Sequence, residues 1–311
     1  MRGRHLVVGA GPVGRNVAEQ LVAVGEEVLL ASRSGAGPEV PGATRIGLDA
    51  SDPEQLARAA AGARAIYNCV NPPAYDTWPT MWPPVAAALL AAAERSGAVL
   101  AITGNLYPYG PVDGPMVEGL PDAGPGIKAR VRATMWADAL AAHEAGRVRA
   151  VEIRGSDYMG AGVGDGGHIP RLVPRALAGK SVRVIGSPDQ PHSWTDVRDM
   201  ARALVAVADR EDAWGRVWHA PTNAPRTQRE AVADVCRAAG RAPVEVRTYP
   251  KAALALGGLV SPMLRELRET AYQFEGPYIL DSTAITRDLG LQPTTWGEVC
   301  RRTAGLEYCP A

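Results

Sequence analysis

The sequence predicts an α/β protein built on a doubly wound parallel sheet, with a smaller mixed C-terminal lobe. Two observations predict it. Short apolar runs alternate with alanine-rich amphipathic stretches as far as Arg154, and the pattern loosens after that point. Strands that alternate with helices at this spacing form βαβ crossovers, which place successive strands parallel in one sheet.

Each element of the first half follows from its local pattern. The expected strands are short apolar runs and the expected helices are amphipathic, and Asp52-Pro53 is a capping signal that opens one of the helices. We expect strands at Leu6–Gly9, Glu27–Ala31, Ala65–Asn68, Ala98–Thr103 and Ala150–Arg154, separated by helices at Arg15–Val24, Asp52–Ala60, Pro84–Arg95 and Arg130–Ala145.

The second half mixes helices and strands with less regularity. It opens with a glycine-rich loop at Gly160–Gly167, and it contains no internal repeat or low-complexity linker. The sequence therefore predicts two regions, 1–155 and 156–311, of which the second packs directly on the first and returns segments to the sheet. Helices are expected at Ile169–Ala178, Val197–Ala208, Thr227–Ala239 and Ser261–Tyr272, with strands at Val182–Ile185 and Val244–Thr248.

Composition narrows the class of protein. The 311 residues suffice for two fused lobes, and 46% hydrophobic residues with 21% charged ones are ordinary for a globular enzyme. Lys+Arg 33 balance Asp+Glu 33, whereas nucleic-acid binders usually carry a basic excess. No C-x-x-C pair occurs among Cys69, Cys236, Cys300 and Cys309, so neither a disulfide framework nor a metal site is indicated.

The chain also lacks the usual membrane and export signals. His5-Leu6-Val7-Val8 already has the character of a core strand, and no apolar run is long enough to span a bilayer. We therefore expect a cytoplasmic protein that binds a small molecule, with no nucleic acid and no membrane as partner. The sequence leaves a homodimer open.

The segment Gly9-Ala10-Gly11-Pro12-Val13-Gly14 fits the G-x-G-x-x-G pattern between a predicted strand and a predicted helix. The first glycine permits the tight turn, the second lets the backbone approach a pyrophosphate, and the third allows close packing of helix on strand. The N-terminus of the helix adds free N–H groups for the phosphates. This combination predicts a dinucleotide-binding Rossmann domain.

The end of the second predicted strand indicates which dinucleotide binds. An acidic residue there would hydrogen-bond the ribose hydroxyls of NAD, but the sequence has Ala31-Ser32-Arg33-Ser34. Arg33 can pair with a 2′-phosphate, Ser32 and Ser34 can donate to it, and Arg15 lies near the same place. The pattern favours NADP, with NAD as the alternative.

The chain resembles the extended form of the short-chain dehydrogenase/reductase superfamily, whose members include NAD(P)-dependent epimerases and dehydratases. Besides the glycine motif, Asp49-Ala50 resembles the acidic turn that contacts adenine, and Cys69-Val70 resembles the strand end beside the adenosine ribose. The run Thr103–Gly110 resembles the family's serine-bearing strand end followed by Tyr-Gly. The resemblance of two later blocks implies substrate contacts for Asp157, Tyr158, His192 and Trp194.

The sequence departs from this family at the centre of its chemistry. Where the family carries Tyr-x-x-x-Lys, the sequence has Lys128-Ala129-Arg130-Val131-Arg132, and no tyrosine occurs between Tyr109 and Tyr158. Spacing of i,i+4 puts Lys128 and Arg132 on one helix face. Arg132 is the candidate for the ribose contact and Lys128 for proton transfer, because a lysine pKa falls readily near another cation. The alternative is that this face only binds the cofactor.

The family's serine is also missing. Three nearby residues are candidates either to replace this serine or to act as the proton-donating acid. Thr103 or Asn105 falls at the serine position, and Tyr107 lies just beyond as a substitute acid.

Two functions remain open at this stage. The first is an NADP-dependent oxidoreductase that reduces a carbonyl or imine, or epimerises its substrate. Apolar and aromatic residues of the second half, Trp194, Met263, Tyr272 and Phe274, favour a small hydrophobic metabolite for it. The second is a protein of the same fold without redox chemistry, which acts as a cofactor sensor or as an isomerase or cyclase.

Overall fold

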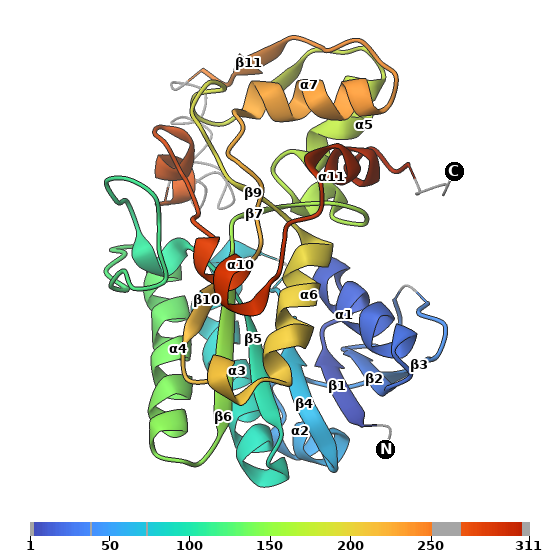
Figure 1. Ribbon diagram of the computed structural model, residues 1–311, viewed down its shortest axis with the longest axis vertical. Helices are drawn as coiled ribbons and strands as arrows, with labels where there is room; N and C mark the ends of the chain where they lie inside the picture. Colours follow the sequence, from blue (N-terminus) through green and yellow to red (C-terminus); the bar gives the residue numbers. More distant parts are fainter. Residues whose placement is uncertain (1–2, 38, 73, 251–268, 307–311) are drawn as a thin grey trace.

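A seven-stranded parallel sheet forms the base of the molecule in the computed structural model (Figure 1). The structure describes residues 3–37, 39–72, 74–250 and 269–306. Within these ranges the strand order is β3-β2-β1-β4-β5-β6-β10. The bounds are β1 Arg4–Val8, β2 Glu27–Ser32, β3 Ala43–Gly47, β4 Ala63–Asn68, β5 Val99–Asn105, β6 Arg149–Gly155 and β10 Val217–His219.

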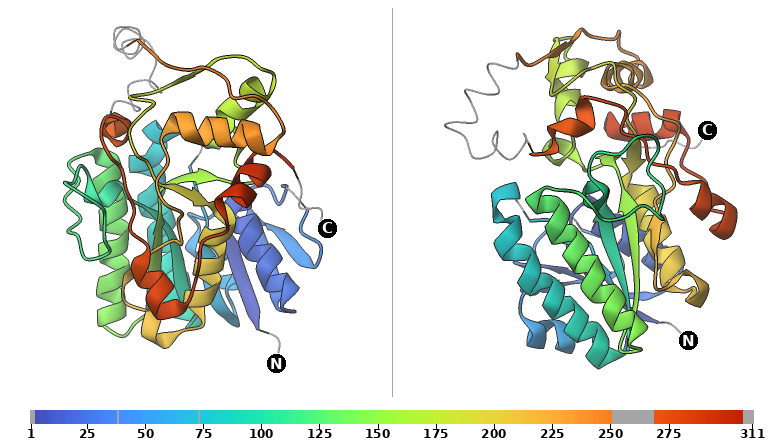
Figure 2. Two further views of the ribbon diagram at one scale, coloured as in Figure 1. Left: turned by 45° about the horizontal axis from the view of Figure 1, so that its top comes forward. Right: turned by 90° about the vertical axis from the view of Figure 1, so that its left-hand side faces the viewer.

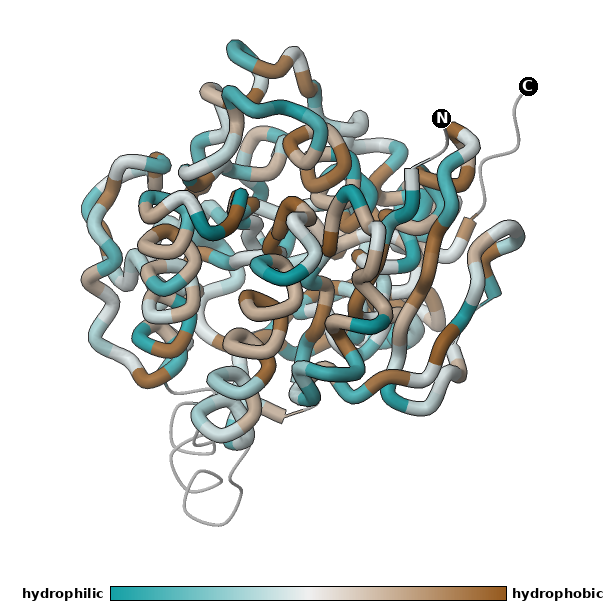
Figure 3. Tube along the Cα trace, turned by 90° about the horizontal axis from the view of Figure 1, so that it is seen from below, coloured by the Kyte–Doolittle hydropathy of each residue, from teal (hydrophilic) through white to brown (hydrophobic). Residues whose placement is uncertain are grey.

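Helices cover both faces of this sheet (Figure 2). On one face lie α1 (Pro12–Ala23) and α6 (Val197–Ala208), and on the other lie α2 (Pro53–Ala59), α3 (Trp78–Ser96) and α4 (Ile127–Glu144). Because helices cover both faces, the central strands β1, β4, β5 and β6 are almost entirely buried, whereas the edge strand β3 is mostly exposed. Figure 3 shows the hydropathy along the chain, with apolar and polar residues mixed along the helices. The prediction of a doubly wound sheet is confirmed.

The strand order reverses between β1 and β4. Strand β1 pairs with β2 on one side and with β4 on the other, so the crossover connections leave β1 in opposite directions. Such a switch point leaves a crevice beyond the carboxyl ends of the strands, and that crevice is the usual ligand site of an open α/β sheet.

A smaller mixed lobe lies above this crevice (Figure 1). Its apolar core joins two short parallel strand pairs to helices, and helix α7 begins with a capping box formed by Thr227 and Glu230. The lobe contains β7 (Asp157–Met159) paired with β9 (Trp194–Asp196), β8 (Val182–Val184) paired with β11 (Val246–Thr248), and helices α5 (Val173–Leu177), α7 (Gln228–Ala238) and α11 (Trp296–Thr303).

The chain returns from the lobe to the sheet. Helix α6 packs against α1, β10 extends the sheet beside β6, and α10 (Thr283–Leu289) places Ile285 in the same core. Single turns of 3-10 helix are η1 Tyr75–Thr77, η2 Tyr107–Tyr109, η3 Gly164–Gly166, η4 Pro170–Leu172, η5 Glu211–Ala213 and η6 Ala271–Phe274. No helix in the described ranges combines the length and apolar composition that a membrane span needs.

The structure corrects several predicted elements. Helix α3 begins at Trp78 rather than Pro84, because Trp78 and Trp82 are buried in the core and their burial outweighs the cost of two prolines inside the helix. The edge strand β3 was not predicted, since its side chains are mostly exposed and it lacks an apolar run. Prolines divide the helix expected at Ile169–Ala178 into η4 and α5. Of the helix expected at Ser261–Tyr272, residues 261–268 lie outside the described ranges.

Candidate functional site

A cavity of about 570 Å³ occupies the crevice at the switch point. Its walls come from the carboxyl ends of β1, β2, β4 and β5, from the first turns of α1 and α3, and from β7 of the lobe. Most of the predicted cofactor residues line it, namely Gly9, Gly11, Pro12, Val13, Ser32, Arg33, Asp49, Ala50, Cys69, Val70 and Arg132.

The glycine turn has the geometry that a pyrophosphate needs. Gly9 has φ +112, which is a backbone conformation that favours glycine, and a Cβ there would collide with the Cys69 carbonyl. Gly14 lies beneath the turn, where a Cβ would overlap the carbonyl oxygen of Gly9. A Cβ on Gly11, by contrast, would meet no atom within 4 Å, so the space in front of Gly11 is open. No side chain caps the N-terminus of α1, which leaves its N–H groups available to an anion.

Arg33 and Asp49 lie at the far end of the cavity. The Asp49 carboxylate accepts hydrogen bonds from the backbone N–H (2.9 Å) and hydroxyl (2.7 Å) of Ser51. These bonds, with a smaller contribution from the Arg33 charge, hold the pKa of Asp49 below its ordinary value. Arg33 is exposed, and the Ser32 hydroxyl donates to the Ala36 carbonyl at 2.6 Å. This end therefore presents a cation beside a small acidic turn.

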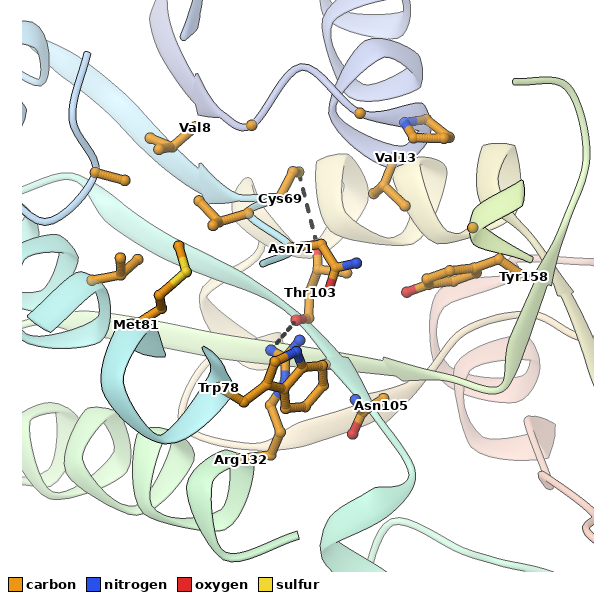
Figure 4. Close-up of a pocket in the computed structure, with 18 of the residues that line it drawn as sticks. Val8, Val13, Cys69, Asn71, Trp78, Met81, Thr103, Asn105, Arg132 and Tyr158 are labelled. Carbon is orange, nitrogen blue, oxygen red and sulfur yellow. Dashed lines mark hydrogen bonds between the residues drawn. The ribbon is translucent and has the colours of Figure 1, made fainter. Parts of the chain in front are cut away.

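Arg132 reaches the middle of the cavity from α4 (Figure 4). Its guanidinium donates to the Thr103 carbonyl at 3.1 Å and stacks on Trp82, with the ring centroid 4.1 Å away. Burial lowers the pKa of Arg132, and its Nε atom has no hydrogen-bond partner among the described residues. The Thr103 hydroxyl is turned toward the Cys69 sulfur at 3.7 Å. The cation is thus held rigidly and retains a donor for a ligand.

Tyr107 brings a phenol to the other end of the same cavity. Its hydroxyl lies 3.0 Å from that of Tyr75, and its backbone N–H donates to the Asn105 side chain at 3.2 Å. Burial raises the pKa of Tyr107 well above its ordinary value, and the neighbouring Tyr75 and Asp157 raise it further. The phenol therefore stays protonated at neutral pH and can donate a hydrogen bond.

Asp157 and Tyr158 of β7 also line the cavity. The Tyr158 hydroxyl is buried without a partner among the described residues and points into the open space (Figure 4). Burial raises its pKa. The Asp157 side chain is 24% exposed and accepts a hydrogen bond from His192.

Lys128 lies outside this cavity. It lines a second, smaller cavity of about 220 Å³ with Glu269 and Tyr272, and Tyr107 separates the two spaces. The Glu269 carboxylate accepts bonds from the Lys128 backbone N–H at 2.8 Å and from Lys128 Nζ at 3.0 Å. Lys128 therefore forms an ion pair between the two lobes. Its side chain reaches a different cavity from that of Arg132, although the sequence places both residues on one helix face.

His192 and Trp194 do not line the larger cavity either. Both are buried in the lobe, where Trp194 donates from its indole to the Arg226 carbonyl at 2.9 Å. The imidazole of His192 lies against the Trp194 ring, with centroids 4.3 Å apart. The predicted substrate contacts are thus divided, since Asp157 and Tyr158 face the cavity and the other two lie behind it.

Sequence reasoning missed part of the wall. These residues follow β4 or belong to the late segment around η6, and they are Asn71, Tyr75, Trp78, Met81, Gln273 and Tyr278. The aromatic residues directly after β4 were a usable signal, because that strand end borders the crevice of a doubly wound sheet. Within the described ranges no group of three or more His, Cys, Asp or Glu side chains is arranged to hold a metal ion.

Solved structures share this fold at low sequence identity. The dTDP-glucose 4,6-dehydratase of Bacillus anthracis, solved with NAD, has a TM-score of 0.78 at 17% identity over 97% of this chain and 96% of that one. The dTDP-glucose 4,6-dehydratase of Streptomyces venezuelae, with NAD and TYD bound, has a TM-score of 0.77 at 20% identity over 96% and 95%. UDP-glucose 4-epimerase of Brucella ovis, with NAD, has a TM-score of 0.76 at 19% identity over 98% of each chain.

A family model assigns the chain more directly than these structures do. No curated protein matches the sequence. The model described as "NAD dependent epimerase/dehydratase family" matches residues 5–219, which include the glycine motif, Arg132 and all of the sheet except its first residue, Arg4. Because this match spans more than half of the chain, the protein belongs to the NAD-dependent epimerase/dehydratase family and is an enzyme that uses a nicotinamide nucleotide.

Proposed function

We propose that the protein is an NADP(H)-dependent oxidoreductase that interconverts a carbonyl and a hydroxyl group on a small, largely hydrophobic metabolite. One observation carries this proposal. A single cavity joins the glycine turn and Arg33 at one end to protonated phenols and an apolar wall at the other. A dinucleotide bound along it would place its reactive ring beside the aromatic end.

The residues of the cavity fit this cofactor. The open space before Gly11 and the uncapped N-terminus of α1 suit a pyrophosphate. Arg33 suits a 2′-phosphate, because a guanidinium binds phosphate through paired hydrogen bonds and the end of β2 carries no carboxylate to repel it. The unpartnered Nε of Arg132 suits a ribose hydroxyl. When bound, the nicotinamide supplies or accepts the hydride.

In this proposal Tyr107 donates a hydrogen bond to the substrate oxygen. A buried, protonated phenol donates a hydrogen bond to a carbonyl oxygen and stabilises the negative charge that develops there. Its raised pKa keeps it protonated at neutral pH, so it donates a hydrogen bond and is not available to accept a proton. Lys128 has no proton-transfer role in this proposal, since its ammonium is paired with Glu269 outside the cavity.

The aromatic end favours a substrate with an apolar body. Tyr75, Trp78, Met81 and Tyr278 supply most of this wall. Among the described residues that line this end, Arg132 provides a cation and Asp157 an anion. A nucleotide diphosphate would lie close to that anion, whereas an uncharged carbonyl compound avoids the repulsion.

A screen with NADPH and a panel of aldehydes, ketones and imines tests the proposal. We expect substrate-dependent oxidation of NADPH by the unmodified protein. Tyr107→Phe should lower the reduction rate about 10²–10³-fold, which is typical for the loss of one donor to a developing oxyanion, with NADPH affinity unchanged. Tyr75→Phe is the matched control and should change the rate much less. Saturable NADPH binding without oxidation by any member of the panel would instead favour the cofactor sensor or the non-redox isomerase.

A further inference from the structure

His192 carries hydrogen-bond acceptors at both of its ring nitrogens. Its Nε2 lies 2.8 Å from Asp157 Oδ2, and its Nδ1 lies 3.2 Å from the backbone carbonyl oxygen of Gln273. A carbonyl oxygen can only accept, so Nδ1 must carry a proton. The contact at Nε2 then needs a second proton between the imidazole and the carboxylate.

The surroundings place this second proton on His192. His168 is the nearby imidazole, and it accepts from Arg171 at 3.2 Å through Nδ1, so its Nε2 donates to Gln228. His168 is therefore neutral, in agreement with burial lowering its pKa to about 4. Burial alone would raise the pKa of Asp157, but the hydrogen bond and charge of His192, with a smaller contribution from Arg171, outweigh it and leave this pKa below its ordinary value. An imidazolium beside a carboxylate satisfies all of these contacts.

The pair has a definite orientation relative to the cavity. The His192 side chain is 1% exposed and lies behind Asp157, whereas the Asp157 side chain is 24% exposed and lines the cavity. His192 uses Oδ2, and no hydrogen bond from the described residues reaches Oδ1. Other titratable groups around the carboxylate are phenols with raised pKa values, including Tyr75, Tyr107, Tyr158 and Tyr278. Asp157 is thus an ionised acceptor among protonated donors.

We propose that Asp157 accepts the proton of the substrate hydroxyl, and that His192 is a positioning residue that keeps the carboxylate ionised and oriented. This inference rests on the proposed function and supplies the base that Tyr107 cannot provide. It also specifies that the substrate is an alcohol in the oxidative direction of the reaction. The oxygen of this alcohol contacts both Tyr107 and Asp157. At neutral pH Tyr107 is protonated and Asp157 is ionised, so Tyr107 donates a hydrogen bond and Asp157 accepts the proton.

In the oxidative direction, the O–H bond of the alcohol breaks and its proton passes to Asp157 Oδ1. The C–H bond on the same carbon breaks, its electron pair leaves with the hydride to oxidised NADP, and a C=O double bond forms. The alcohol is oxidised and the nicotinamide is reduced. Reduction of the carbonyl follows the reverse path, and Asp157 returns the proton.

Nitrogen NMR of the histidine side chains tests the proton count without any turnover. We expect both nitrogens of His192 to be protonated at neutral pH in the unmodified protein, with His168 neutral in the same spectrum as an internal control. In Asp157→Asn, His192 should become neutral. A neutral His192 in the unmodified protein would overturn the inference.

Alcohol oxidation with NADP tests the role in the reaction. Asp157→Asn should lower its rate about 10²–10⁴-fold with NADPH affinity unchanged. His192→Gln keeps a donor toward Asp157 but removes the charge, so the acidic limb of the pH profile should move to higher pH. If the unmodified protein neither binds NADPH nor catalyses redox chemistry, the proposed function fails. If it is active and Asp157→Asn keeps the full rate, or His192→Gln leaves the pH profile in place, this inference alone is overturned.

Discussion

Lys128 and Arg132 lie one helical turn apart on α4, yet their side chains reach two different cavities. Arg132 is drawn inward by stacking on Trp82 and by the Thr103 carbonyl. Lys128 belongs to the first turn, where a Glu269 carboxylate satisfies both its backbone N–H and its ammonium. Equivalent spacing on a helix therefore does not give two residues the same environment.

Lys128→Met should affect stability rather than chemistry. The substitution leaves the Glu269 carboxylate, 23% exposed, without its ammonium partner. We expect a loss of about 1–3 kcal/mol in the free energy of unfolding, less than for a fully buried pair because solvent screens Glu269. Denaturant unfolding measures this loss, and steady-state turnover should change less than about tenfold.

Glu269→Gln is the control, because its side-chain oxygen can still accept from the Lys128 backbone. It should cost at least as much stability as Lys128→Met, because it leaves the buried Lys128 ammonium without the Glu269 carboxylate. A loss of turnover of about 10²–10⁴-fold in Lys128→Met, with unfolding unchanged, would return the proton-transfer role to the lysine.

The cofactor residues were predictable from the sequence because they belong to one contiguous motif and to strand ends. Gly9, Gly11 and Arg33 each follow an apolar run that the structure confirms as a strand, and all three line the cavity. The partners of Asp157 and Lys128 were not predictable. They lie 35 and 141 residues away, and only packing of the lobe brings them together.

At the scale of elements, helix α6 depends on a buried carboxylate at its start. The Asp196 side chain accepts from the Arg198 backbone N–H at 2.6 Å and lies 3.6 Å from Arg302. Burial raises the pKa of Asp196 to about 6, although Arg302 and the backbone hydrogen bond act against it. The cap is therefore favourable in geometry but costly when it is ionised.

The stability of the fold should consequently fall as the pH rises through this pKa. In the folded state Asp196 keeps its proton above the pH at which an unfolded aspartate loses it, so its contribution is present at low pH and is lost toward pH 6. The change is on the order of 2–3 kcal/mol. Asp196→Asn keeps a side-chain oxygen that can cap α6 but has no proton to titrate. The free energy of unfolding, measured with denaturant at several pH values, should therefore lose this part of its pH dependence. If the same pH dependence persists in Asp196→Asn, its assignment to Asp196 is contradicted.

Elements with strong periodicity were predicted well, and elements that depend on tertiary contacts were not. Helix α6 has the predicted bounds, and α7 differs by one residue at each end. The short strands β7, β9 and β10 have three residues each and exist because a neighbouring strand pairs with them. Helix α3 begins early for a similar reason, since Trp78 and Trp82 fold onto Arg132 of α4.

At the scale of the whole molecule, the cavity depends on both lobes. The sheet supplies the glycine turn, Arg33 and Thr103, while the lobe supplies Asp157 and Tyr278. The chain leaves the sheet after β6, builds the lobe, and returns through α6 and β10. This return fixes β7 over the switch point and so brings Asp157, the proposed base, to the wall of the cavity.

Cofactor recognition can be tested separately from chemistry, because Arg33 follows β2 and Tyr107 follows β5, and β1 and β4 lie between these two strands in the sheet. Arg33→Asp should therefore change which dinucleotide binds without altering the aromatic end. Arg15→Asp is the matched control. It makes the same change of charge on α1, where Arg15 pairs with Glu19 at 2.6 Å and does not line the cavity.

Calorimetric titration of NADPH and NADH into these three proteins is the decisive measurement for NADP recognition by Arg33. We expect the unmodified protein and Arg15→Asp to bind NADPH more tightly than NADH, by about 10–100-fold, since a charge-assisted bond to phosphate contributes roughly 1.5–3 kcal/mol. Arg33→Asp should bind NADH more tightly. Equal affinities of the unmodified protein for the two dinucleotides would rule out this role of Arg33.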